Sequence, residues 1–223
     1  MGNLQELIER YCPDGVEYKA LAEVASFGGG HTPSKAVSDN YEDNGIWWVT
    51  SKDVKSRELS STGITLSEVG AANLMMYPAG TLVMVTRSGI LKRILPVAIL
   101  TCPMTVNQDI KAIMVDESLV MPKYLLHIFV SEDDIIRQRY GKAGGTVDSI
   151  NFNLVKKHRI PIPPIEVQRE IVRLLDAYTA AHDALVAKLN EEIELQAKSL
   201  ATYRETLLTF AERERESKVG HVG

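Results

Sequence analysis

The sequence is poor in cysteine and carries no excess of positive charge. Its 223 residues include two cysteines, Cys12 and Cys102, which lie too far apart in the chain for a typical metal-binding pair, and they give no reason to expect a disulfide framework. The five histidines are scattered and suggest no metal site. A formal net charge of −4 argues against a nucleic-acid binder that works through a uniformly basic surface.

No segment is apolar enough over its length to cross a membrane. The most apolar stretch, 81–100, is interrupted by Arg87, Lys92, Arg93 and Pro96, whereas a spanning helix needs about 20 predominantly apolar residues. The first ten residues are acidic and amphipathic, unlike a secretory leader. We therefore expect a protein of the reducing cytoplasm without membrane association.

The motifs of several enzyme classes are missing. The segment 28–34 is rich in glycine but has no lysine where a phosphate-binding loop needs one, and Pro33 removes a backbone donor. The sequence also lacks dinucleotide-binding, metalloprotease and serine-hydrolase motifs, and the Asn-Pro-Pro-aromatic tetrapeptide that amino-methyltransferases use. We expect a chain with no catalytic site, no bound metal and no cofactor of its own.

The composition of the chain changes near residue 164. All nine prolines and thirteen of the fifteen glycines lie before this point, and residues 165–219 contain neither. The first part alternates short apolar runs with turn residues, which is typical of a mixed α+β domain. We therefore predict a domain at residues 1–164, a long helix at 165–217 and a flexible tail at 218–223.

Particular segments of the first part carry strand or helix patterns. Strands are predicted at 45–50, 81–86, 97–100 and 109–115, helices at 4–11 and 122–139, and a flexible break at 28–30. Residues 17–26 fit either a short helix or the entry to a strand. If Trp47 and Trp48 lie on a strand, they point to opposite faces, so one of them is expected in the core.

The second part carries an apolar stripe with the spacing of a coiled coil. Val186, Ile193, Leu200 and Leu207 occupy one heptad position, and Leu189, Gln196, Tyr203 and Phe210 lie three residues later. A helix over 166–210 is roughly 65 Å long at about 1.5 Å per residue, more than one domain of about 160 residues can cover. Either the helix folds back on itself or a partner supplies the covering helix, and we favour an obligate association.

Positive charge concentrates between residues 135 and 159. This segment has six basic side chains and one acidic one, namely Arg137, Arg139, Lys142, Lys156, Lys157 and Arg159 against Asp148. Inside it, residues 144–146 read Gly-Gly-Thr, which fits either a loop that donates amides to a phosphate or a simple turn. The sequence is therefore compatible with a local basic surface on a neutral domain.

The order of the motifs resembles that of the specificity subunits of type I restriction-modification systems, over roughly residues 13–210. The matching segments are 13–16, 21–24, 30–34, 46–54, 78–82, 107–109, 144–146 and 160–164, followed by Gln168, Ile171, Val172, Leu175 and Asp176. Each motif alone is weak, whereas their common order is specific. The last run is the family's most specific signature, where the recognition domain passes into a spacer helix.

The resemblance implies a DNA-reading subunit with three partners: DNA, a methyltransferase subunit and a restriction subunit that acts as motor and nuclease. S-adenosylmethionine would bind the methyltransferase. The usual family member carries two recognition domains and two helices, whereas this sequence has one of each. The difference implies a homodimer with antiparallel helices that reads a bipartite, palindromic site.

DNA contacts are expected from polar loops beside the shared motifs. The candidates are His31, Ser34, Lys35, Lys52, Lys55, Arg57, Arg87, Ser88, Lys92, Arg93, Lys142, Lys156 and Lys157. Arg87 and Arg93 are preferred for guanine, because arginine can donate two hydrogen bonds to one base, and the last three lysines suit phosphates. At each position an ordinary exposed side chain is the alternative. The rival function is a coiled-coil scaffold with an α+β head that binds no DNA, which leaves the ordered motifs unexplained.

Overall fold

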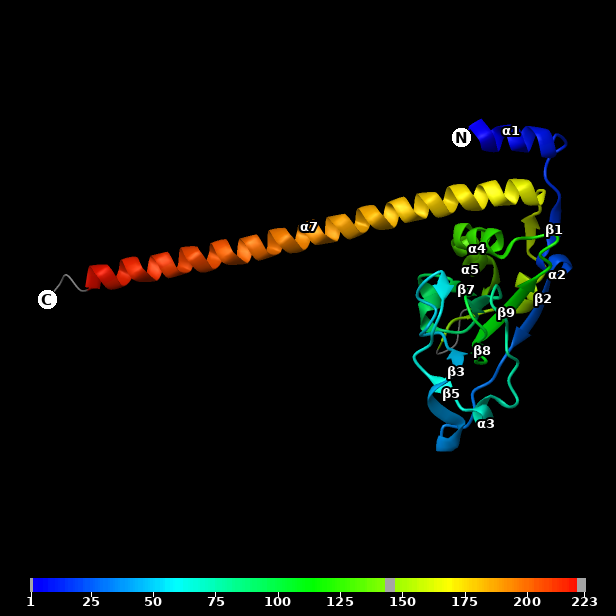
Figure 1. The fold of residues 1–223 in the computed structure, drawn as a ribbon, viewed down its shortest axis with the longest axis horizontal. Coiled ribbons are helices and arrows are strands. Elements are labelled where there is room, and N and C mark those ends of the chain that lie inside the picture. The colour runs from blue at the N-terminus through cyan, green and yellow to red at the C-terminus, as the bar shows by residue number, and fades with distance from the viewer. Residues whose placement is uncertain (1, 143–146, 220–223) are drawn as a thin grey trace. The chain divides into compact units, whose positions relative to one another are not determined.

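The computed structural model describes the backbone of residues 2–142 and 147–219, and the side-chain surroundings within 4–142 and 147–209. The chain forms two units, Met1–Arg173 and Leu174–Gly223. The first contains strands and short helices, and the long helix α7 (Ile165–Val219) begins in it and makes up the second, so the predicted α+β class is confirmed (Figure 1). No helix within the described residues is long and apolar enough to cross a membrane.

A five-stranded sheet forms the centre of the first unit. The strand order is β2-β9-β6-β7-β4, with β4 parallel to β7 and the other pairs antiparallel. The strands are β2 (Ala25–Gly29), β4 (Glu58–Leu59), β6 (Leu82–Val85), β7 (Val97–Leu100) and β9 (Ile110–Val115). The predicted strands at 81–86, 97–100 and 109–115 became the contiguous centre, β9-β6-β7, because aliphatic and β-branched side chains suit strands that are buried on both faces.

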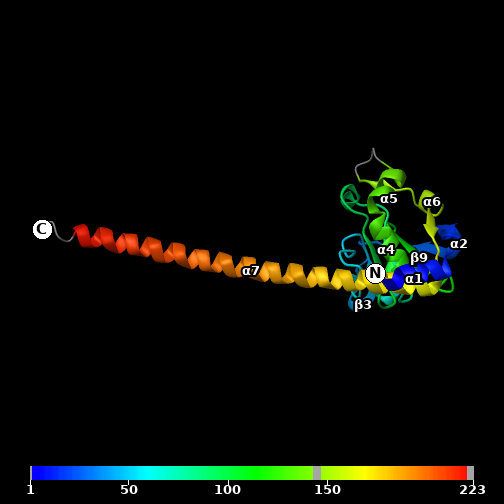
Figure 2. The ribbon, with the colours of Figure 1, turned by 90° about the horizontal axis from the view of Figure 1, so that it is seen from above.

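Helices cover one face of this sheet. They are α4 (Pro122–Ser131), α5 (Asp133–Tyr140) and α6 (Phe152–Val155). Leu82 and Met84 of β6 point into an apolar cluster that includes Leu125 and Phe129 of α4 and Ile136 of α5. Figures 1 and 2 show α4 and α5 on this side of the sheet.

A smaller sheet lies on the opposite face. It consists of β3 (Tyr41–Val49), β5 (Thr65–Leu66) and β8 (Thr105–Val106), in the order β5-β3-β8. Val83 and Val85 of β6 point into this second apolar layer. Trp48 is 2% exposed and packs in a separate small cluster, whereas Trp47 is half-buried, so the prediction that one of the two tryptophans is core is confirmed.

Short elements complete the first unit. They are α1 (Gly2–Tyr11), β1 (Tyr18–Ala20), α2 (Leu21–Val24), the 3-10 turns η1 (Ser38–Asn40) and η2 (Gly89–Lys92), α3 (Glu68–Ala71), β10 (Gly141–Lys142), β11 (Ser149–Ile150) and β12 (Arg159–Pro161). β1 pairs antiparallel with β12, so Tyr18 lies opposite Pro161 and the two ends of the domain are joined. The ambiguous segment 17–26 contains β1, α2 and the start of β2.

One local prediction was confirmed with an interruption, and another was wrong. Residues 122–139 are helical as predicted, but they form two helices, α4 and α5, joined at Glu132 (φ −104°, ψ 16°). Long-range contacts hold this joint: the Glu132 carboxylate contacts Nε2 of buried His158, and Asp133 accepts a hydrogen bond from Leu95 N at 2.9 Å. Residues 28–30 do not form the flexible break that was predicted, since Gly28 and Gly29 end β2 and pair with β9.

The first turns of α7 are tied to the domain by Gln168. α7 begins directly after Pro164, whose carbonyl accepts from the backbone of Val167 at 2.9 Å and of Gln168 at 3.1 Å. The Gln168 side chain is fully buried, accepts from Met121 N at 2.9 Å and donates to the carbonyls of Leu119 at 2.7 Å and Pro163 at 2.8 Å. One amide thus satisfies three backbone groups where the helix starts.

Candidate nucleic-acid interface

One end of the five-stranded sheet gathers the connecting segments. β2 ends where β9 begins, since Gly29 lies opposite Lys111. β6 ends there too, with Val85 opposite Ile110, and β7 begins there, because Val97 lies opposite Met84. β4 lies at the other end, where it pairs with Ile99 and Leu100 of β7. We call this end the loop edge and define it by residues 30–35, 86–96 and 107–109, together with residues 52–57, which run from the hydrogen bond between Asn107 and Val49 along β7 to β4.

Ten of the thirteen predicted DNA-contact residues lie on the loop edge. His31, Ser34 and Lys35 follow β2; Lys52, Lys55 and Arg57 precede β4; Arg87, Ser88, Lys92 and Arg93 connect β6 to β7. All are exposed except the half-buried Ser88. Pairing of strands that are distant in sequence therefore brings the segments after β2 and β6 to one end of the sheet, and residues 52–57 extend this polar surface along β7. An interface that reads base edges needs polar side chains grouped in this way.

The segment after β2 is held by its backbone and by buried neighbours. Thr32 donates from Oγ1 to Oε1 of Gln108 at 2.6 Å, and Trp48 donates from Nε1 to the carbonyl of His31 at 3.3 Å. A Cβ on Gly30 would lie 1.7 Å from the carbonyl oxygen of Val106, so this position needs glycine. The His31 ring stays exposed while its backbone is fixed.

The segment between β6 and β7 is fixed in the same way. The carbonyl of Thr86 accepts from Ile150 N at 2.8 Å, Arg87 forms a β-bridge with Ser149, and Ser88 N donates to the carbonyl of Asp148 at 3.1 Å. These bonds join the segment to β11. The exposed Arg87 side chain therefore stands on an ordered backbone, which reduces the entropy lost when it binds.

An aspartate organises the segment before β4. The Asp53 carboxylate accepts from N and Oγ1 of Thr50, at 2.8 and 2.6 Å, and from Gly63 N at 2.8 Å. Asn107 N donates to the carbonyl of Val49 at 2.9 Å, which joins this segment to residues 107–109. The Lys52 side chain lies within this turn and is exposed.

The remaining candidates separate into two groups. Lys142 and Lys156 line one open cavity of about 440 Å³, which we call the lysine cavity, whereas Lys157 is exposed outside it. The cavity is also lined by Phe27, Gly28, Lys111, Ile150, Asn151, Phe152 and Asn153. Lys111 was not among the predicted DNA contacts, although a lysine inside the apolar run 110–115 could have indicated a charged site. The predicted Gly-Gly-Thr loop at 144–146 lies outside the described residues.

Basic residues outnumber acidic ones at the loop edge by seven to two. Asp53 and Asp109 lie among its basic residues and both are half-buried. Beneath it, Tyr77 donates from its hydroxyl to the carbonyl of Gly29 at 2.8 Å, and burial raises the Tyr77 pKa, so this phenol stays neutral. Within the described residues no group of three or more His, Cys, Asp or Glu side chains could hold a metal ion.

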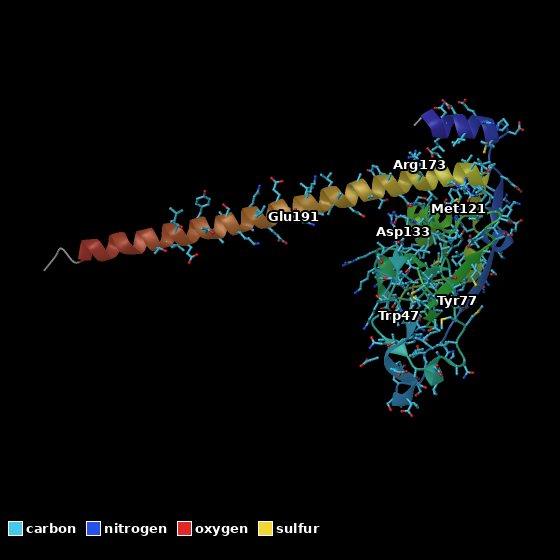
Figure 3. All side chains as sticks on the ribbon, viewed as in Figure 1. Trp47, Tyr77, Met121, Asp133, Arg173 and Glu191 are labelled. Atoms are coloured by element: carbon cyan, nitrogen blue, oxygen red, sulfur yellow. The ribbon has the colours of Figure 1, made fainter. Side chains whose placement is uncertain are left out.

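The predicted apolar stripe of α7 is exposed in the isolated chain. The exposed fractions are 40% for Val186, 49% for Leu189, 62% for Ile193, 52% for Leu200, 67% for Tyr203 and 69% for Leu207. Gln196 is exposed as well, and the side chain of Phe210 lies outside the described residues. Figure 3 shows side chains standing away from α7 around Glu191. A row of large apolar groups on one helix favours burial against another helix.

Comparison with known proteins identifies relatives of this chain. Residues 13–195 match the family described as type I restriction modification DNA specificity domain. The chain is 34% identical over 201 residues to the type I restriction enzyme EcoR124I/EcoR124II specificity subunit of Escherichia coli, covering 89% of this chain and 50% of the relative. It is 27% identical over 215 residues to the EcoprrI specificity subunit of the same species, covering 91% and 52%. The chain spans about half the length of the curated relatives it matches.

Solved structures share the fold. The HsdS subunit from Thermoanaerobacter tengcongensis superposes with a TM-score of 0.58 at 20% identity, over 82% of this chain and 44% of that one. A chain from a study of complex assembly and conformational transition of the type I R-M system gives 0.64 at 20% identity, over 86% and 47%. At this identity the likeness shows the architecture alone.

Proposed function

The chain belongs to the family of type I restriction modification DNA specificity domains, and on this premise we propose that it is the DNA-reading component of a type I restriction-modification complex. The loop edge is the observation that carries the proposal, because exposed cationic and hydrogen-bonding side chains from three segments stand there on an ordered sheet. The role is recognition without catalysis. The names of the relatives, which are specificity subunits, support it.

Bases are read at the loop edge through the major groove. Arg87 and Arg93 each donate two hydrogen bonds to a guanine, while His31 and Ser88 offer single donors or acceptors. The lysines of the same edge contact phosphates, which set affinity and orientation but carry no base information. The formal charge of −4 keeps binding by the isolated chain weak, and affinity rises when a methyltransferase subunit adds its own phosphate contacts.

Chemistry belongs to the partners. A methyltransferase subunit binds S-adenosylmethionine and methylates the site, and a restriction subunit cleaves DNA when it joins the complex. This chain positions both on their target and holds neither cofactor nor metal.

A second copy of this chain covers the apolar stripe of α7. In an antiparallel pair with its two-fold axis between Ile193 and Gln196, Leu200 packs against Leu189 of the other copy and Val186 packs against Tyr203. The stripe is therefore complementary to itself. The same register brings Asp183 of one copy beside Arg204 of the other, whereas a parallel pair forms no opposite-charge flank of this kind.

Two identical readers related by a two-fold axis prefer identical half-sites in inverted orientation. The paired helices set the distance between the readers, so the bases between the half-sites are unread and the target is an interrupted palindrome. Deleting one heptad, residues 190–196, shortens the helix by about 10 Å. This length equals about three base pairs at roughly 3.4 Å each, so the gap in the recognised site shortens if the coiled coil re-forms.

Methylation sequencing of cells that carry only this chain and its methyltransferase tests the proposal. An interrupted palindromic motif is expected, and Arg87→Ala and Arg93→Ala should relax the same base in both half-sites. An asymmetric bipartite motif requires a second, different reader and overturns the homodimer while leaving recognition intact. No methylated motif, together with no DNA binding by the complex in a filter assay at low salt, leaves the coiled-coil scaffold as the function.

A further inference from the structure

The lysine cavity contains three positive charges and no negative one. Its lining includes Lys111, Lys142 and Lys156 and no acidic residue. Within the described residues, none of these lysines forms an ion pair. Like charges that converge on one cavity repel each other, and in a chain with a formal net charge of −4 such a concentration needs a reason. An anionic ligand supplies one.

The Lys156 ammonium is held in place before any ligand binds, and the Lys111 ammonium lies close to the backbone of β2. Lys156 Nζ lies 5.0 Å from the ring centroid of Phe27 and 5.8 Å from that of Phe152, and the two rings contact edge to face at 5.4 Å. Lys111 Nζ lies over Gly29, where an added Cβ would come within 3.0 Å of it. A cavity whose charges are already placed loses less side-chain entropy on binding.

The cavity also offers neutral hydrogen-bond donors and ample space. Asn151 and Asn153 line it, and within the described residues neither side chain has a hydrogen-bond partner. Its volume of about 440 Å³ exceeds that of ten water molecules, at about 30 Å³ each. It is open to solvent, so it suits a length of extended anionic chain better than one enclosed ion.

The cavity is connected to the loop edge through β10 and β11. Lys142 lies opposite Ser149 in the β10–β11 pair, and Ser149 forms the β-bridge with Arg87. Lys111 pairs with Gly29, directly before the segment that carries His31. A strand of DNA whose bases meet Arg87 therefore has its backbone within reach of the cavity.

We propose that the lysine cavity binds the sugar–phosphate backbone of DNA beside the bases that the loop edge reads. The proposal rests on the proposed function. It assigns contact with the DNA backbone to the residues of the lysine cavity and base reading to those of the loop edge. The cavity holds a phosphodiester through Lys111, Lys142 and Lys156, with no preference for any base. It sets affinity and salt dependence, whereas the loop edge sets sequence.

Salt titration of the complex tests this assignment. The full chain with its methyltransferase subunit is titrated with two unrelated duplexes of equal length, for wild type and for Lys111→Ala, Lys142→Ala and Lys156→Ala. Each variant should weaken binding to both duplexes by the same factor and reduce the slope of log K against log salt by about 0.9 for each phosphate that is no longer neutralised. Lys188→Ala is the matched control, because it removes the same charge at an exposed position on α7 outside the apolar stripe. Its slope should stay at the wild-type value.

Neutral phosphate analogues locate the contact on the DNA. Single methylphosphonate substitutions are scanned along a duplex that carries the methylated motif, and wild type should lose affinity at one phosphate, or two neighbours, in each half-site. In Lys142→Ala the loss at that phosphate should disappear. Lys142→Arg keeps the charge and should keep the loss, and thermal melting identifies any variant that fails to fold.

The outcomes separate the two proposals. If wild type binds duplexes but the lysine variants keep its slope, or alter the methylated motif, the cavity assignment is wrong and the proposed function stands. If the slope of log K against log salt falls equally in Lys188→Ala, the effect comes from net charge alone, and the cavity assignment is also wrong. If the wild-type complex binds no duplex at low salt, both proposals fail together.

Discussion

Substitution of Gln168 should strongly lower the free energy of unfolding, because this one buried side chain makes three hydrogen bonds to the backbone. Gln168→Ala removes the acceptor for Met121 N and the donors to the carbonyls of Leu119 and Pro163. A buried polar group without a partner costs about 1–3 kcal/mol. Leu119 and Met121 are half-buried, so water reaches part of this site, and we expect a loss of about 3 kcal/mol in the free energy of unfolding. This is a large share of the roughly 5–15 kcal/mol of a typical domain.

Urea unfolding followed by tryptophan fluorescence measures this loss. Both tryptophans lie in β3, so the signal reports the first unit and not the long helix. Wild type and variant are compared at one protein concentration, because association adds to apparent stability. Gln138→Ala is the matched control: it removes the same side chain from an exposed position of α5, and its effect should stay within about 0.5 kcal/mol.

Gln168→Glu distinguishes the hydrogen bonds from simple packing. It keeps the shape of the side chain but turns an oxygen toward the two carbonyls that Nε2 served, and it buries a charge. We expect it to destabilise at least as much as alanine at neutral pH, and less at pH 4, where the carboxyl can be protonated. If Gln168→Ala costs under about 1 kcal/mol, or Gln168→Glu is tolerated at neutral pH, the reasoning is refuted.

Three further predictions follow from particular contacts. Gly30→Ala places a Cβ 1.7 Å from the Val106 carbonyl, so it should cost about 2 kcal/mol or more in thermal melting, whereas Gly89→Ala, with open space around it, should not. Burial raises the pKa of Tyr124 from its ordinary value of 10.0 to about 12. The neutral phenol therefore contributes stability that is fully present below pH 10 and is lost as the pH rises to 12. In urea unfolding, Tyr124→Phe should remove about 2 kcal/mol of this loss of stability at alkaline pH. Leu189→Asp or Leu200→Asp should dissociate the dimer in sedimentation experiments, and Asp183→Arg should weaken it unless Arg204→Asp is added; a monomeric wild type at micromolar concentration would contradict both.

The central strands were predictable because their information is local. β6 and β7 are short runs of aliphatic and β-branched residues bounded by turn residues, and such a run has few alternatives to a buried strand. β2 (Ala25–Gly29) and β4 (Glu58–Leu59) have no such signal. They are strands because β9 and β7 offer them hydrogen bonds, so tertiary pairing decides what propensity does not.

The helix break at Glu132 was not predictable for a similar reason. Residues 122–139 keep a helical pattern throughout, and the interruption depends on contacts with His158 and Leu95, which are distant in sequence. The candidate site was also predictable only in part. Sequence indicated which loops are polar, but their meeting at one end of a sheet depends on the strand order β2-β9-β6-β7-β4. Lys111 was missed because it lies in a strand instead of a loop.

The loop edge separates the groups that hold the fold from the groups that face solvent. Its segments are held by backbone hydrogen bonds, by the buried Trp48 and by glycine at position 30, while Arg87, Lys92 and Arg93 point into solvent. Alanine at these three positions should therefore change the free energy of unfolding by less than about 0.5 kcal/mol each, as is usual for exposed sites. The same substitutions remove the donors that distinguish one base from another. Stability and base recognition therefore depend on different residues. Recognition can be altered by substitutions at the exposed positions without weakening the sheet that carries them.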